Sequence, residues 1–83
     1  MRLPDQADGD LPEFDPQDFA YWRPTSGIWY LHVPGVGLAG LRLHTVTEHP
    51  DGTITVSPSI LVGAGLDGPR RHGYFERGIW RDV

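Results

Sequence analysis

Four histidines are the side chains of this sequence best suited to metal binding or proton transfer. They are His32, His44, His49 and His72. Imidazole is a common zinc ligand, and three such ligands with one water make a typical catalytic zinc site. His44 and His49 are five residues apart, however, so on one regular strand they point to opposite faces. Because the chain has no cysteine, we expect polar or half-buried histidines, with His72 hydrogen-bonded near the last hairpin, no metal site and no other cofactor.

A glycine-rich stretch is the second candidate for chemistry. Residues 63–68 read Gly-Ala-Gly-Leu-Asp-Gly and satisfy the pattern G-x-G-x-x-G after a predicted strand. In dinucleotide-binding proteins the last glycine of this pattern opens a helix whose N-terminus faces the pyrophosphate. Here a Pro-Arg-Arg run and a further strand follow, and only 15 residues remain. We therefore do not expect a dinucleotide fold.

The same stretch retains a simpler possibility, which is anion binding. Gly63, Gly65 and Gly68 supply flexible backbone, and Arg70 and Arg71 follow directly. Successive backbone N–H groups can cradle an anion, and arginine can contact a phosphate through two hydrogen bonds. Aromatic side chains on the adjoining strands could stack a base. These five residues are the candidate site for a small phosphate-bearing ligand such as a nucleotide, and the alternative is a loop with two solvated arginines.

Serine chemistry has less support in the sequence. Ser57 and Ser59 flank Pro58 on a predicted strand, and His72 belongs to a strand that could come near them. The G-x-S-x-G turn that exposes a nucleophilic serine in hydrolases is missing. Serine and histidine are also ordinary residues of strands. We assign no catalytic residue and expect a protein that is not an enzyme.

Charge is unevenly distributed along the chain. Residues 1–20 hold six acidic residues and one arginine, a net of 1 − 6 = −5, whereas residues 21–83 hold six arginines and five acidic residues, a net of 6 − 5 = +1. With a net charge of −4 and no basic stripe, direct binding to nucleic acid is not expected. The acidic segment suits contact with a basic protein surface, with Asp5, Asp8 and Asp10 as candidate residues. The alternative is that it only promotes solubility.

The aromatic content is high for so short a chain, with three Trp, three Tyr and three Phe. Most of these rings should lie in the core. A small sheet cannot cover both of its faces, so some rings should form an interface with a second copy or with another protein. We name Trp22 and Trp29 as candidate partner-binding residues and expect a homo-oligomer.

These residues must be positioned by a very small scaffold. Eighty-three residues make one domain, which buries only about 60% of its unfolded surface. We divide the chain into an acidic extended arm, residues 1–13, which orders against a partner, and a single small β domain, residues 14–83. Neither a signal peptide nor an apolar run long enough to span a membrane is recognisable. We therefore expect a cytoplasmic protein without membrane contact, with the virion as a second possible location.

A short helix is expected just after the arm. Asp15 is a good N-cap, and Pro16 occupies the first helical position, where its missing N–H costs nothing. Phe14 and Phe19 have the spacing of a hydrophobic staple. Pro24 cannot continue a helix. These signals predict one or two helical turns over residues 16–22.

The rest of the chain has the signals of antiparallel strands. Residues 28–33 are apolar on both faces and predict a central strand; alternating residues within 38–48 predict a second, and 53–62 a third. The turn at residues 49–52 joins the last two, and Pro58 predicts a bulge or an exposed edge. Residues 63–71 should form a loop, and 72–75 with 79–82 a final hairpin. The fold class is mainly β, a small antiparallel sheet of five or six strands with one short N-terminal helix.

Three short motifs carry a family resemblance: Pro58-Ser59-Ile60, His72-Gly73-Tyr74 and Gly78-Ile79-Trp80. In this order, separated by a variable loop, they resemble a family of small uncharacterised phage and bacterial proteins, some of which carry the loose label "ammonia monooxygenase". The similarity covers about half of the chain, and short members encoded by actinobacterial phages are the most alike. Many members have a Cys-Pro-Cys-Gly knuckle where this chain has residues 31–35, and another cysteine near the histidine. Because those thiols are missing here, the resemblance implies a fold rather than an inherited zinc site.

Three functions are compatible with these observations. The first is a non-enzymatic phage-type accessory protein that binds a host or phage protein. The second is a protein that binds or sequesters a small phosphate-bearing ligand through Arg70 and Arg71. The third is a structural or decoration protein of a virion. The aromatic rings and the acidic arm favour the first.

Overall fold

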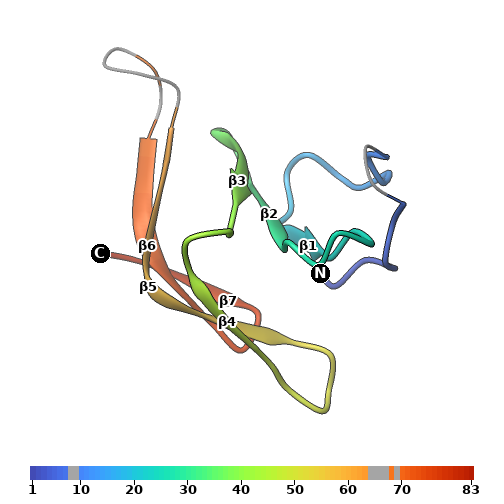
Figure 1. The fold of residues 1–83 in the computed structure, drawn as a ribbon. Coiled ribbons are helices and arrows are strands. Elements are labelled where there is room, and N and C mark those ends of the chain that lie inside the picture. The colour runs from blue at the N-terminus through green and yellow to red at the C-terminus, as the bar shows by residue number, and fades with distance from the viewer. Residues whose placement is uncertain (8–9, 64–67, 69) are drawn as a thin grey trace.

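The computed structural model describes residues 1–7, 10–63, 68 and 70–83. Within them the chain forms seven strands and no helix (Figure 1). The strands are β1 (Ala20–Trp22), β2 (Tyr30–Val33), β3 (Gly37–Gly40), β4 (Thr45–Glu48), β5 (Ile54–Gly63), β6 (Arg70–Glu76) and β7 (Ile79–Asp82). Sheet 1 has the order β1-β2-β3 and sheet 2 the order β4-β5-β6-β7. All neighbouring strands are antiparallel.

The mainly β prediction is therefore confirmed, but two of its details are wrong. The described strands number seven rather than five or six, and they form two sheets rather than one. The predicted strand within residues 38–48 is two strands, β3 and β4, which belong to different sheets. Between them the N–H of His44 donates to the carbonyl of Leu41, and the Leu41 side chain is buried. The chain thus passes from sheet 1 to sheet 2 through a turn whose first residue, Leu41, is buried in the core.

The predicted helix over residues 16–22 does not form. Asp15 does act as a cap, because its carboxylate accepts a hydrogen bond from the N–H of Gln17 at 2.9 Å. The N–H of Asp18 then bonds to the Asp15 carbonyl at 3.0 Å, and the turn ends there. From residue 20 the chain is strand β1, whose three residues are all buried. Pairing with β2 and burial of both faces outweigh a weak local preference for helix.

The main hydrophobic core lies between the two sheets. Sheet 1 contributes Tyr21, Leu31 and Val33, and the largest completely buried side chain is Phe75 from β6. The rings of Tyr21 and Phe75 meet edge to face, with centroids 5.3 Å apart. The other face of sheet 1 carries a second, smaller cluster, formed by Leu3, Ala20 and Trp22, with Phe14 and Tyr30 packed against it. Sheet 1 thus has apolar contacts on both faces, and those on its outer face are less extensive.

Residues 1–6 lie beside β1 rather than away from the body. Short parallel bridges join Arg2 to Tyr21 and Gln6 to Pro24, and the N–H of Leu3 donates to the Tyr21 carbonyl at 2.9 Å. Leu3 is 7% exposed. Figure 1 shows the blue N-terminal segment on the side of sheet 1 that faces away from the β5–β6 hairpin. These first residues order against the chain itself; whether residues 1–13 act as a separate arm stays a prediction.

The turns and the bulge follow the sequence signals closely. The N–H of Gly52 donates to the His49 carbonyl at 2.9 Å, and Gly52 has a φ of 87°. Arg77 and Gly78 both have positive φ, 49° and 78°, and form the two-residue turn of the last hairpin. The pairing of β5 with β6 shifts in register between Val56 and Ile60, which agrees with the bulge or exposed edge predicted at Pro58. In the part of the chain that is described, no helix is long and apolar enough to cross a membrane.

Candidate functional site

A stacked pair of aromatic rings forms the floor of the candidate site. Trp22 on β1 and Tyr30 on β2 are cross-strand partners, with ring centroids 6.0 Å apart and planes tilted by 26°. Trp22 is 2% exposed, because Leu3 and Phe14 pack around it. Tyr30 is only half-buried. The outer face of sheet 1 therefore keeps one aromatic ring partly open to solvent.

Strand β3 leaves space beside this ring. Leu38 on β3 pairs with His32, and its side chain is 48% exposed. The residue opposite Tyr30 is Gly40, which has no side chain to cover the ring. A Cβ placed on Gly40 would come within 3.5 Å of the Tyr30 ring. The lack of that atom keeps the face of sheet 1 open between Tyr30 and β3.

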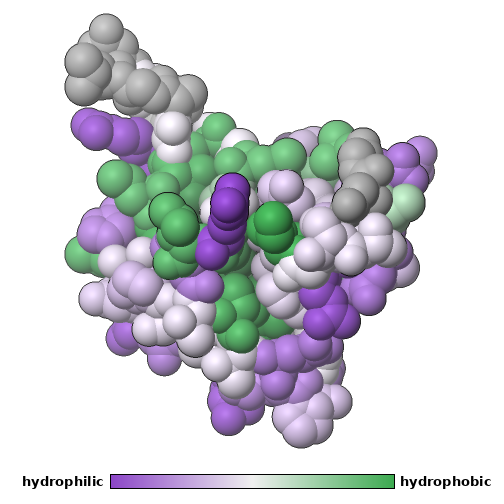
Figure 2. Space-filling view, viewed as in Figure 1, coloured by the Kyte–Doolittle hydropathy of each residue, from purple (hydrophilic) through white to green (hydrophobic). Residues whose placement is uncertain are grey.

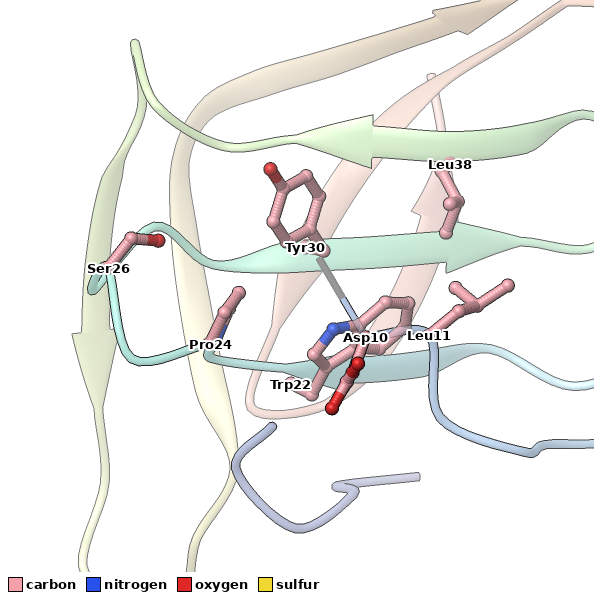
Figure 3. A pocket seen from close by; sticks show the side chains of 7 residues that line it. All are labelled: Asp10, Leu11, Trp22, Pro24, Ser26, Tyr30 and Leu38. Atoms are coloured by element: carbon pink, nitrogen blue, oxygen red, sulfur yellow. The ribbon is translucent and has the colours of Figure 1, made fainter. Parts of the chain in front are cut away.

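The N-terminal segment supplies the opposite wall. Leu11 is 65% exposed, and the N–H of Asp10 is bonded to the Ala7 carbonyl at 3.1 Å. Together these walls enclose a volume of about 350 Å³, which we call the Tyr30 hollow. Figure 3 shows its side chains gathered over the sheet, with the Asp10 carboxylate in front of the Trp22 ring. The lining residues are Asp10, Leu11, Trp22, Pro24, Ser26, Tyr30 and Leu38.

The Tyr30 hollow is mainly apolar, with one carboxylate at its edge. Asp10 is exposed, and among the described residues no ion pair or side-chain hydrogen bond engages its carboxylate. By contrast, Asp5 of the same segment pairs with Arg2 at 3.2 Å and with Arg23 at 3.6 Å. Asp5 is therefore used within the molecule, whereas Asp10 faces the hollow. Asp8, the third acidic residue predicted to contact a partner, lies outside the described residues.

Trp29, also predicted at a partner surface, is enclosed by charged groups of the chain itself. The guanidinium carbons of Arg2 and Arg23 lie 4.3 Å and 5.3 Å from its ring centroid. Glu48 on β4 pairs with both arginines, at 3.5 Å and 3.6 Å, and Asp5 also pairs with both, at 3.2 Å and 3.6 Å. Trp29 is 8% exposed. The structure thus places both predicted tryptophans in the interior, and of the two only Trp22 borders the Tyr30 hollow.

The predicted anion site is built differently from our expectation. Gly63, Arg70 and Arg71 belong to strands β5 and β6 rather than to a loop, and Gly63 pairs with Arg70. The Arg71 guanidinium contacts both carboxylate oxygens of Asp82, at 3.3 Å and 3.1 Å. Arg70 is exposed and Gly68 is half-buried, while Gly65 lies outside the described residues. Of the two arginines, Arg71 already has a carboxylate partner.

Each histidine has a hydrogen-bond partner within the chain. His72 bonds to the Ser59 hydroxyl at 2.8 Å beside the last hairpin, as predicted. The partners of His32, His44 and His49 are the Asp18 carbonyl, the Ser59 carbonyl and the Thr55 hydroxyl. No cluster of three or more metal-ligating side chains occurs in residues 1–7, 10–63, 68 and 70–83. The Ser59–His72 pair lies on an exposed strand surface, and no carboxylate of the described residues bonds to this histidine.

Among the described residues, three side chains have clearly shifted pKa values, and none of them lines the Tyr30 hollow. Hydrogen bonds from Arg71 and then from the Trp80 indole lower the pKa of Asp82. Hydrogen bonds from the Thr53 hydroxyl and backbone lower the pKa of Asp51. Burial raises the pKa of Tyr21, with Arg2 acting in the opposite direction. These groups bear on stability rather than on the candidate site.

Asp10 and Trp22, two of the residues predicted to contact a partner, line the Tyr30 hollow, and its other lining residues were not predicted. Tyr30 could have been found, because the alternation of β2 places it on the same face as His32 and opposite Trp22. Leu11 and Leu38 carry no local signal, since they meet only through the fold. No protein family, curated protein or solved structure matches this chain. The resemblance to small phage and bacterial proteins stays an expectation.

Proposed function

We propose that this chain is a non-enzymatic accessory protein of the phage type, which acts by binding a host or phage protein. The Tyr30 hollow is the surface that receives a short extended segment of that partner. The observation that carries the proposal is an apolar, aromatic hollow of about 350 Å³ on the outer face of sheet 1. A half-buried aromatic ring with two exposed leucines beside it forms an apolar patch of the kind that marks interaction sites.

The shape and composition of the hollow suit a peptide. Extended and proline-rich segments bind in grooves lined by aromatic side chains. Tyr30 and Trp22 form such a floor, and Leu11 and Leu38 form apolar walls on opposite sides. The hollow is at the lower end of the usual size range for ligand sites. It therefore suits one or two side chains of a segment that continues across the surface.

Selection from a random-peptide library tests this proposal without knowledge of the partner's sequence. A random-peptide display library is selected on the wild-type protein, and the enriched peptides are titrated against two variants. Leu38→Asp places a charge in the wall of the hollow, and we expect it to weaken binding at least tenfold, which is about 1.4 kcal/mol. Leu38 is 48% exposed, so the substitution leaves the core intact.

Leu43→Asp is the matched control. Leu43 is 91% exposed and lies outside the hollow, so the same chemical change there should leave binding unchanged. Peptides that bind wild type and both variants equally, or a selection that enriches no peptide, would show that the hollow is not a protein-binding surface. Circular dichroism of all three proteins checks that the fold is kept.

Two other functions stay predictions. Binding of a small phosphate-bearing ligand would depend mostly on Arg70, since Arg71 is paired with Asp82. A thermal-shift screen of nucleotides tests it, because a ligand that binds only the folded state raises the melting temperature. A role as a virion structural or decoration protein would appear as co-purification with particles.

A further inference from the structure

Arginines of this protein repeatedly occupy one kind of position, over an aromatic ring and beside a carboxylate. The first case is Trp29. Arg2 lies 4.3 Å and Arg23 5.3 Å from the centroid of its ring. The two guanidinium groups are held there by Asp5 and Glu48, with nitrogen–oxygen distances between 3.2 and 3.6 Å.

Two more cases occur in sheet 2. Arg71 lies 5.6 Å from the centroid of Trp80 and is held by Asp82 at 3.1 Å. Arg81 lies 5.1 Å from the centroid of Tyr74 and is held by Glu76 at 2.7 Å. The ring attracts the cation through its quadrupole, and the carboxylate fixes the planar guanidinium by charge-assisted hydrogen bonds. Four arginines of the chain, Arg2, Arg23, Arg71 and Arg81, share this combination of a ring and a carboxylate.

The Tyr30 hollow has the ring and the carboxylate but no guanidinium. Tyr30 and Trp22 provide the aromatic surface, and Asp10 provides the carboxylate. Among the described residues that line it there is no arginine. Since Trp22 is 2% exposed, the half-buried Tyr30 is the ring that an incoming group would contact most. Figure 3 shows Asp10 on the same side of the sheet as both rings.

We infer that the Tyr30 hollow receives an arginine side chain of the partner protein. This inference rests on the proposed function and names the chemistry that the partner must supply. The guanidinium would stack on Tyr30 and bond to Asp10, while the methylene groups of its side chain would lie against Leu11 and Leu38. Asp10 is the one charged side chain among the described lining residues, and its negative charge favours a cationic group in the hollow.

Arginine fits this site better than lysine does. Its guanidinium is planar, weakly hydrated and able to make two parallel bonds to a carboxylate, whereas an ammonium is a compact and strongly hydrated charge. Citrulline has the shape of arginine without its charge. The three side chains therefore separate the contributions of shape, charge and planarity.

The test uses capped proline-flanked heptapeptides that differ only in the central residue, which is arginine, lysine or citrulline. Binding to the full chain is followed by NMR, through the signals of the Trp22 indole and of Leu38. We expect the arginine peptide to bind about tenfold more tightly than the other two, as for one charge-assisted contact. Asp10→Asn should remove that advantage. Glu13→Gln, an exposed acid of the same segment that does not line the hollow, should preserve it.

Each contrary result has a distinct meaning. Equal binding of the arginine and citrulline peptides at the hollow, or an advantage that survives Asp10→Asn, overturns the arginine assignment but leaves the hollow as a protein-binding site. Lysine binding as tightly as arginine overturns the preference for a guanidinium. Free agmatine binding as tightly as the arginine peptide overturns a protein segment as the source. If no peptide of this set or of the display library perturbs the hollow, the proposed function fails together with this inference.

Discussion

At the scale of single residues, Gly73 shows how closely this small sheet is packed. The indole of Trp80 on β7 lies directly over its Cα on the neighbouring strand. A Cβ at position 73 would come within 2.6 Å of two Trp80 ring carbons and of the Arg81 carbonyl oxygen. Real Cβ atoms do not approach backbone oxygens so closely, so either the indole or the strand would have to move.

Gly73→Ala should therefore destabilise the protein by about 1–3 kcal/mol, the usual cost of overpacking. Urea unfolding followed by circular dichroism measures it. Gly40→Ala is the matched control, because a Cβ there meets only the Tyr30 ring, at an ordinary contact distance of 3.5 Å. A Gly73 variant as stable as the Gly40 variant would contradict this account of the packing.

Ionisation of Asp82 should make the free energy of unfolding depend on pH in the acid range. Its pKa is lowered in the folded protein, first by the hydrogen bond from Arg71 and then by the one from Trp80. A carboxylate with a lowered folded-state pKa stabilises the fold above its unfolded pKa of about 3.9, and this stabilisation is lost as the pH falls through the lower folded value.

The urea midpoint of wild type should consequently fall as the pH is lowered from about 6 to below about 3. Part of that fall should disappear in Asp82→Asn, which cannot ionise. Asp51, whose pKa is lowered by Thr53, contributes in the same direction, so the variant should retain a smaller pH dependence. An identical pH dependence in wild type and Asp82→Asn would exclude a role for this carboxylate.

At the scale of elements, the N-terminal segment is part of the folded unit. Its Leu3 side chain is 7% exposed and packs in the cluster of Ala20 and Trp22. Its Arg2 and Asp5 belong to the group of charged side chains that surround the Trp29 indole. These ion pairs are partly exposed, with side-chain exposures between 25% and 51%, so each contributes little stability. The apolar contact of Leu3 holds the segment more firmly.

Leu3→Ala should cost at least about 2 kcal/mol, the lower range for removing a buried leucine side chain. Thermal and urea unfolding measure this cost, with Leu43→Ala as the control, since Leu43 is 91% exposed. Deleting the whole segment would remove both the buried Leu3 and the hollow residue Asp10, so a loss of binding could reflect a loss of stability. The single substitution Asp10→Asn changes the hollow and leaves Leu3 in place. A Leu3 variant as stable as the Leu43 variant would show that the segment is not anchored by its side chain.

At the scale of the whole molecule, the sandwich is too thin to bury all of its large apolar side chains. Its principal dimensions are 34 × 23 × 23 Å. Sheet 2 keeps an outer face on which Leu61 is 64% exposed, Tyr74 41% and Ile79 71%. This outer face of sheet 2 is where we place the predicted homo-oligomer contact. Seen from the direction of Figure 1, Figure 2 shows a band of hydrophobic residues across the upper part of the molecule.

Sedimentation velocity over a range of concentrations tests the oligomer. We expect wild type to self-associate, and Leu61→Asp or Ile79→Asp to shift it to monomer, because a charge buried at an apolar interface without a partner is costly. Leu43→Asp should leave the assembly unchanged. A monomer at every concentration, or a dimer that tolerates both substitutions, would exclude this face as the contact.

Single residue types predicted several local features of this fold. The positions of the turns follow from Gly52, Gly78 and their neighbours, since only residues tolerant of positive φ fit there. Pro58 indicated where the pairing of β5 with β6 is interrupted, because it cannot donate a ladder hydrogen bond. The apolar run around Leu31 identified the central strand of sheet 1. In each case one residue type restricts the backbone locally, whatever surrounds it.

Other features were decided only by the tertiary structure. The capping signal at Asp15 was real, but pairing of β1 with β2 replaced a helix by a strand. Trp29 became an interior residue because Arg2, Arg23, Asp5 and Glu48 converge on it from separate elements. The Tyr30 hollow likewise joins residues 10–11 to β2 and β3. Such contacts depend on how two sheets and a terminal segment share one small core, and no local pattern encodes that.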